Sequence, residues 1–164
     1  MSNLIISWSE YHSKIEKLAK KIYYSQWQFN QIICIAKGGL RIGDILARLY
    51  DIPLAILSVK SYEGNNNRQQ GNIIFSKNIS MTRQNLNNKI LLVDDLVDSG
   101  ITLTATIQWL NKNFNNDIKE IKTAVIWYKS CSKFKPDYYI DYLLDNPWIY
   151  QPFEKYEKMK IEDI

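Results

Sequence analysis

Apolar residues in the first fifty positions alternate between helical and strand-like spacing. Between residues 9 and 24 they recur every three or four positions, which places them on one face of an amphipathic helix: Tyr11, Ile15, Leu18 and Ile22. Ser9 with the adjacent Glu10 is a start signal for this helix. The β-branched run 31–36 ends at Lys37-Gly38-Gly39, so it predicts a buried strand followed by a glycine turn.

The same alternation continues through the middle of the chain. Asp51 and Pro53 close a second predicted helix, whose apolar face carries Ile42, Ile45, Leu46 and Leu49. A later helix is predicted from Leu103, Ile107 and Leu110, and further strands are predicted at 54–59, 89–93 and 120–128. Strands that alternate with helices predict an α/β fold, with a central, mainly parallel sheet flanked by helices.

Two regions depart from this alternation. Residues 61–88 contain Gly64, Gly71 and three consecutive asparagines, which predict a long mobile loop at about 62–75 with a β-hairpin beside it. Long loops in compact domains are usually lids or binding loops. The segment 138–164 is rich in Tyr and Trp and is interrupted by two prolines.

Composition places the chain in a broad class without assigning a function. A length of 164 residues fits one domain, 1–164. The net charge of +4 is too small to mark a nucleic-acid partner, and it suits an anionic small molecule equally well. Cys34 and Cys131 do not form a CxxC pair, and neither a signal peptide nor a membrane span is recognisable, so we expect a cytoplasmic protein.

The segment 91–102 carries the most chemical information. Its apolar strand delivers the adjacent carboxylates Asp94 and Asp95 at the strand's carboxyl end, where open α/β sheets bind ligands. Asp98 follows, and the small residues 99–102 then open a helix whose free N–H groups form a phosphate site. Because carboxylates would repel a phosphate, we expect them to face the hydroxyl groups of a sugar phosphate or Mg²⁺.

Three other interpretations of this segment explain less. Helix capping accounts for Asp98 or Ser99 but leaves the pair Asp94-Asp95 unexplained. An acidic strand of a P-loop NTPase requires a GxxxxGK[ST] motif, which the chain lacks, and the pattern of a calcium-binding loop is not matched either.

The segment 91–102 resembles the PRPP-binding signature of type I phosphoribosyltransferases, in which four apolar residues, two acids and a loop of small residues follow one another. Ser99 stands where Thr is commoner. The turn Ile35-Ala-Lys-Gly-Gly-Leu40 is similar to the family's pyrophosphate loop. There the resemblance implies that Lys37, Gly38 and backbone N–H groups bind pyrophosphate, after a peptide bond that is commonly cis.

The resemblance narrows to compact bacterial xanthine-guanine phosphoribosyltransferases and extends to about Glu154. It implies a type I phosphoribosyltransferase fold, with a small C-terminal hood, mainly 130–164, over the site. It also implies that the Lys129 ammonium donates to the purine O6, that Trp148 stacks on the base, and that the Ile149 backbone reads the 2-substituent. A solvated lysine at 129 and a core tryptophan at 148 are the alternatives.

The remaining roles follow from the same resemblance. Asp94 and Asp95 would hold the ribose diol, with Asp95 contacting Mg²⁺, and Asp98 would face purine N7 as the catalytic base or hydrogen-bond partner. Arg68 in the loop would meet PRPP or pyrophosphate. The 5′-phosphate would bind at Ser99, Gly100, Ile101 and Thr102.

The implied reaction joins a 6-oxopurine (xanthine, guanine or hypoxanthine) to PRPP, giving a nucleoside 5′-monophosphate and pyrophosphate. Relatives form homodimers or homotetramers, so we expect one of these assemblies and no nucleic-acid partner. One alternative is a PRPP-binding regulator with the same fold and no turnover. Another is an enzyme that prefers hypoxanthine over xanthine or guanine.

Overall fold

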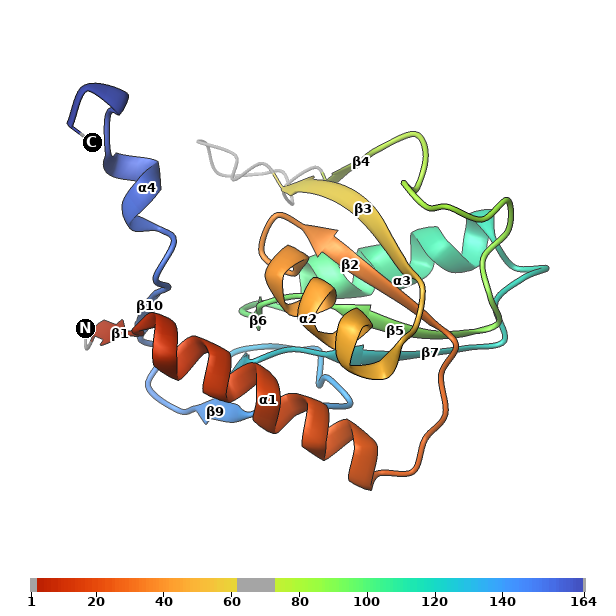
Figure 1. Cartoon of the computed structure of the whole chain (residues 1–164), viewed down its shortest axis with the longest axis horizontal. Helices are drawn as coiled ribbons and strands as arrows, with labels where there is room; N and C mark the ends of the chain where they lie inside the picture. Colours follow the sequence, from red (N-terminus) through yellow and green to blue (C-terminus); the bar gives the residue numbers. More distant parts are fainter. Residues whose placement is uncertain (1–2, 62–72, 164) are drawn as a thin grey trace.

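The computed structural model describes residues 3–61 and 73–163, and its centre is a five-stranded sheet (Figure 1). The strand order is β4-β3-β2-β5-β7. Four strands are parallel, namely β2 (Gln31–Ala36), β3 (Leu54–Ser61), β5 (Lys89–Val93) and β7 (Glu120–Ala124). The mainly parallel sheet is therefore confirmed.

The edge strand β4 (Ile73–Phe75) pairs antiparallel with β3. The antiparallel pairing agrees with the predicted hairpin in its second strand only, because its first strand is β3, which mostly precedes the region 61–88. It corrects the end of the predicted loop, because residues 73–75 belong to a strand; the rest of the loop, 62–72, lies outside the described residues.

Helices cover both faces of the sheet. α1 (Trp8–Tyr24) and α2 (Leu40–Tyr50) lie on one face, and α3 (Ile101–Asn113) lies on the other (Figure 1). Successive β2 residues point to opposite faces, so Ile32 and Cys34 join the core under α1 and α2, whereas Ile33 and Ile35 join the core under α3. This two-sided burial explains why the strand is apolar throughout.

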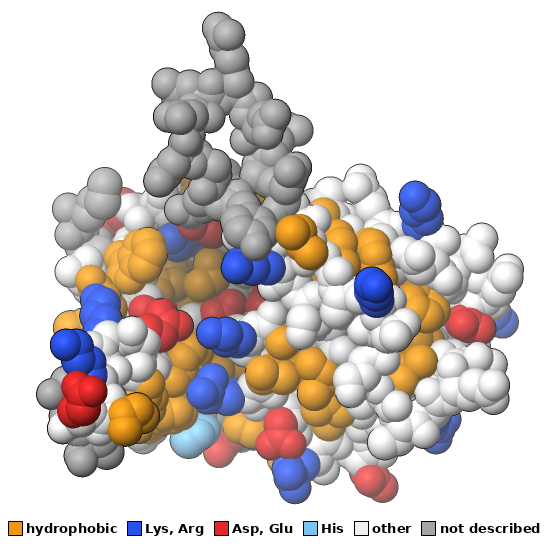
Figure 2. Space-filling view, turned by 90° about the horizontal axis from the view of Figure 1, so that it is seen from above, with side chains coloured by type: hydrophobic (Ala, Val, Ile, Leu, Met, Phe, Trp, Pro, Cys, Tyr) orange, Lys and Arg blue, Asp and Glu red, His pale blue; other side chains and the backbone are white. Residues whose placement is uncertain are grey.

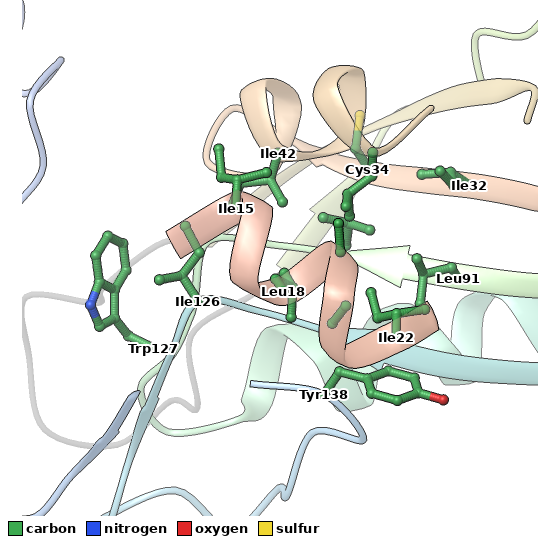
Figure 3. Close-up of a cluster of buried hydrophobic side chains, with 14 of the residues drawn as sticks. Ile15, Leu18, Ile22, Ile32, Cys34, Ile42, Leu91, Ile126, Trp127 and Tyr138 are labelled. Atoms are coloured by element: carbon green, nitrogen blue, oxygen red, sulfur yellow. The ribbon is translucent and has the colours of Figure 1, made fainter. Parts of the chain in front are cut away.

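The predicted face of α1 is the face that packs on the sheet. Figure 3 shows Ile15, Leu18 and Ile22 of this helix among side chains from the sheet. Our predicted start at Ser9 is wrong by two residues: Ser7 is the N-cap, because its hydroxyl accepts from the Glu10 N–H while the Glu10 carboxylate accepts from the Ser7 N–H.

The strand predicted at 120–128 is two strands in two sheets. After β7 the chain leaves the main sheet, and β8 (Trp127–Lys129) pairs parallel with β6 (Leu96–Val97) and β9 (Asp141–Leu143). The break arises because the N–H groups of Ile126 and Trp127 both donate to the carbonyl oxygen of Asp95, at 2.9 and 3.2 Å. Continuous burial from 123 to 127 hides this break in the hydrophobic pattern.

The first strand of the chain pairs with its last strand beside the carboxyl edge of the main sheet. β1 (Asn3–Ile5) pairs parallel with β10 (Trp148–Tyr150), and a tail with α4 (Lys155–Lys158) and the 3-10 turn η1 (Ile161–Asp163) follows (Figure 1). Within residues 3–61 and 73–163, no helix is long and apolar enough to cross a membrane.

Candidate active site at the carboxyl edge of the sheet

The first acid after β5 is buried. Asp94 is 9% exposed, and its carboxylate accepts a hydrogen bond from the N–H of Asp95 at 2.9 Å. Burial, followed by the neighbouring charge of Asp95, raises the pKa of Asp94 well above its ordinary value. A buried carboxyl at a strand end is costly for the fold, which points to a role in ligand binding.

The second acid is held in place from three sides. One carboxylate oxygen of Asp95 accepts from the Leu96 N–H at 2.8 Å, and the other accepts from the side-chain amide of Gln151. On the third side lies the backbone of Gly38, where an added Cβ would come within 2.5 Å of Asp95 Cγ. The glycine turn and the acidic turn, predicted separately, are therefore in contact.

Neighbouring strands bring these two turns together. The turn at Lys37 follows β2, the acids follow β5, and the two strands pair directly. A Cβ on Gly39 would lie 2.4 Å from the Val93 carbonyl oxygen, so only glycine permits this approach. The Ala36–Lys37 peptide bond is cis, as the resemblance implies, and the Lys37 side chain is exposed.

The segment predicted to bind phosphate forms the N-terminus of α3. Gly100 is its N-cap with φ 85°, a left-handed conformation that favours glycine. No acidic residue occupies the first helical turn, so the free N–H groups and the positive end of the dipole are available to an anion. A cavity of about 190 Å³ opens there, lined by residues 94–100, Thr102 and Leu103.

A buried lysine faces the third acid. Lys129 at the end of β8 is 6% exposed, and its Nζ lies 3.5 Å from Oδ2 of Asp98, whose side chain is 58% exposed. The alternative of a solvated surface lysine is therefore wrong. Figure 2 shows acidic side chains in a hollow with Lys and Arg side chains beside it.

The other residues expected to contact the purine lie on β10. Trp148 is 60% exposed, so the alternative of a core tryptophan is wrong, whereas Ile149 is 5% exposed and its side chain packs in the core. A cavity of about 500 Å³ adjoins Trp148, between β1, the start of α1 and the tail. Arg68 lies outside the described residues, so its role stays a prediction.

Two residues of the site were not predicted from the sequence. Gln151 belongs to the Trp148–Glu154 segment that carries the resemblance, but nothing in the pattern pairs it with Asp95. Cys131 follows Lys129 by two positions, and its Sγ lies 3.5 Å from Oδ1 of Asp98. Contacts across such sequence separations have no local signal.

The acids fit a metal ion that is shared with a substrate. Each carboxylate oxygen of Asp95 accepts one hydrogen bond and keeps a second lone pair. Mg²⁺ commonly takes one or two carboxylates and completes its shell with water and phosphate oxygens. Because no three His, Cys, Asp or Glu residues converge in the described part of the chain, the donor set fits Mg²⁺ only when a ligand supplies further oxygens.

Comparisons with known proteins agree with this interpretation of the site. Residues 7–158 match the phosphoribosyl transferase domain family. Xanthine-guanine phosphoribosyltransferases of Idiomarina loihiensis and Chromohalobacter salexigens are 25% and 27% identical over 150 residues, covering 91% of this chain and 85% and 82% of theirs. The crystal structure of a purine phosphoribosyltransferase from Pyrococcus horikoshii Ot3 has a TM-score of 0.75 and 29% identity, covering 93% of this chain and 94% of that one.

These similarities extend over nearly the whole chain and agree with the contact between the glycine turn and the acidic turn. They confirm the type I phosphoribosyltransferase fold and the resemblance to bacterial xanthine-guanine enzymes. They also confirm the expectation of an enzyme that transfers a phosphoribosyl group. The chain thus belongs to the phosphoribosyl transferase domain family.

Proposed function

We propose that this enzyme transfers the phosphoribosyl group of PRPP to a 6-oxopurine with the help of Mg²⁺. The single observation that carries the proposal is the pair formed by Lys129 and Asp98. A cation and a carboxylate side by side match the two adjacent groups on the edge of a 6-oxopurine, the carbonyl O6 and the N7–H. Adenine carries an amino group instead of O6, so the ammonium of Lys129 would select against it.

The phosphate-binding half of the site supports PRPP as the donor. The Lys37 side chain and the backbone at Gly38 would bind the pyrophosphate, and the N-terminus of α3, from Ser99 to Thr102, would bind the 5′-phosphate. Asp94 and Asp95 lie between them and would hold the ribose diol. Mg²⁺, held by Asp95 together with substrate oxygens, would supply Lewis-acid stabilisation of the leaving pyrophosphate.

In the proposed reaction the N9 lone pair bonds to ribose C1, and the bond from C1 to the pyrophosphate oxygen breaks. The electron pair of that bond leaves with pyrophosphate. The proton on N7 passes to the Asp98 carboxylate, which acts as the base. Lys37 stabilises the growing negative charge of the leaving group.

Contacts to the rest of the base come from β10. Trp148 presents most of its ring to solvent and would stack on the purine, while the Ile149 backbone would meet the 2-position. Two of the relatives named above are xanthine-guanine phosphoribosyltransferases. Since a backbone group can serve an amino or a carbonyl substituent, we propose xanthine, guanine and hypoxanthine as the range of bases.

Steady-state turnover with Mg²⁺, PRPP and each of guanine, xanthine, hypoxanthine and adenine tests the proposal. We expect activity with 6-oxopurines, none with adenine, and a loss of about 10²–10⁴-fold in kcat for Asp98→Asn. Asp141→Asn is the matched control, because it removes another Asp–Lys pair, with Lys14 at 2.6 Å, without touching the site. PRPP binding with no turnover of any base would favour the regulator instead.

A further inference from the structure

A hydrogen bond joins the tail to the acidic turn. The amide nitrogen of Gln151 donates to Oδ2 of Asp95 across 56 residues of sequence. Gln151 directly follows β10, and its side chain is buried, with 5% exposed. Resting on the function proposed above, we infer that Gln151 is a positioning residue that holds the Asp95 carboxylate for Mg²⁺ and the ribose of PRPP.

The other end of the Gln151 side chain argues against a purely structural role. Its carbonyl oxygen is buried and accepts no hydrogen bond from residues 3–61 and 73–163. The cost of an unpaired buried acceptor is comparable to the net contribution of a hydrogen bond to a charged group. An apolar side chain of the same size would therefore serve stability about as well, and the amide matters for what it does to Asp95.

Without Gln151, the described part of the chain would leave the Asp95 carboxylate one hydrogen-bonded anchor, the N–H of Leu96 at 2.8 Å. It would then be free to turn about its last side-chain bond. Precise placement of a metal-binding carboxylate depends on such outer contacts, so its loss should weaken Mg²⁺-dependent ligand binding.

The backbone on both sides of Gln151 fixes the position of its side chain. The Tyr150 carbonyl accepts from the Ile6 N–H at 3.0 Å, and the Gln151 carbonyl accepts from the Glu154 N–H at 3.0 Å. The same strand carries Trp148 and Ile149, the residues proposed to hold the base. The hydrogen bond to Asp95 thus connects the proposed purine side of the site with its ribose and metal side.

Calorimetric titration with PRPP at a series of Mg²⁺ concentrations tests this role without requiring turnover. Gln151→Met keeps the size of the side chain and removes the donor. We expect PRPP to bind about tenfold more weakly, about 1.4 kcal/mol, and to need more Mg²⁺ for half-maximal affinity. Gln151→Asn, whose amide is too short to reach Asp95, should behave alike and replaces the Met variant if that variant does not fold.

Gln31→Met is the matched control. Gln31 is also a buried glutamine, 1% exposed, and its amide donates to the Pro53 carbonyl at 2.8 Å, at the start of β2 and away from the acids. We expect this variant to lose stability but to bind PRPP like the wild type. Unchanged PRPP affinity and Mg²⁺ dependence in a folded Gln151 variant would overturn the inference. A wild-type chain that binds Mg²⁺ and PRPP but turns over no base would overturn only the proposed function.

Discussion

The ammonium group of Lys129 lies 3.5 Å from a carboxylate oxygen of Asp98, yet the lysine is buried and the acid is half exposed. A strong ion pair would be shorter, at about 2.7–2.9 Å. An ammonium group has three donors, so this loose pair leaves donors for a ligand. The pair therefore suits a site in which a purine binds between or beside the two charged groups.

Lys129→Met should weaken the use of the purine and spare the binding of PRPP. The variant keeps the aliphatic stem and removes the donor to O6, so we expect kcat/KM for guanine to fall about 100-fold, which is about 2.7 kcal/mol. Competition kinetics should also show a smaller preference for guanine over adenine. Lys112→Met, on the exposed side of α3, is the control. Unchanged kcat/KM would remove Lys129 from the base site.

The two glycines of the turn after β2 should respond differently to alanine. At Gly38 the three atoms nearest to an added Cβ all belong to the Asp95 carboxyl group, at 2.5–2.8 Å, and a side chain can move. We expect Gly38→Ala to fold with a Tm within a few degrees of wild type and to bind PRPP more than about tenfold less tightly. Calorimetry and thermal melts separate the two effects.

Gly39→Ala is the contrasting variant. Its Cβ would lie 2.4 Å from the Val93 carbonyl and 2.9 Å from the Ile35 carbonyl, both backbone atoms of central strands. Because the sheet cannot yield as a side chain can, we expect a loss of about 2–4 kcal/mol in the free energy of unfolding. Equal stability of the two variants would contradict the packing described here.

The sequence allowed prediction of those parts of the fold that local patterns specify. The helix face of Ile15, Leu18 and Ile22 and the strand 89–93 follow from spacing alone, and the structure confirms both. The break at Val125–Ile126 could not be predicted, because it depends on hydrogen bonds to the Asp95 carbonyl some thirty residues earlier. Burial on both sides of the break keeps the apolar run continuous.

The sequence likewise predicts those parts of the site that have a local pattern and misses the others. The acids at 94 and 95 and the turn at Gly38 have local signatures, and parallel strands that end at one edge bring them together. The burial of Lys129 and the hydrogen bond of Gln151 depend on how β8 and the tail fold back over that edge. Neither contact leaves a periodic trace in the sequence, so both required the structure.

Asp94→Asn should stabilise the protein at the expense of its activity. Since burial raises the pKa of Asp94, the folded chain binds this proton more tightly than the unfolded chain. Stability contributed by this group is therefore present at low pH and is lost as the pH rises from the ordinary pKa of aspartate through the raised one. The asparagine variant avoids that loss.

At pH 8 we expect Asp94→Asn to gain about 1 kcal/mol, a Tm increase of about 2–4 °C, and to lose most of its turnover. The gain in stability should shrink as the pH falls toward about 4, where the wild-type carboxyl is protonated. Thermal melts across this range measure it. A wild type that is more stable than the variant at pH 8 would show that the ionised carboxylate stabilises the fold.

Cys131 should be the thiol that alkylation reaches in the folded protein, and its modification should block the base site. Cys34 is fully buried, and burial raises its pKa to about 12, so it should not react. Partial desolvation, and then the hydrogen bond and charge of Asp98, raise the pKa of the exposed Cys131. Because the thiolate is the nucleophile, iodoacetamide should react more slowly than with a free cysteine, and faster as the pH rises.

Since Cys131 Sγ lies 3.5 Å from the Asp98 carboxylate, a carboxamidomethyl group there would occupy the space proposed for the purine. Mass spectrometry should find one modified cysteine as turnover disappears, and bound nucleotide product should slow the reaction. Cys131→Ser keeps a hydroxyl donor for Asp98, so it should retain activity within about threefold and resist iodoacetamide. Full activity of the alkylated wild type would show that the base does not approach Asp98 from the side of Cys131.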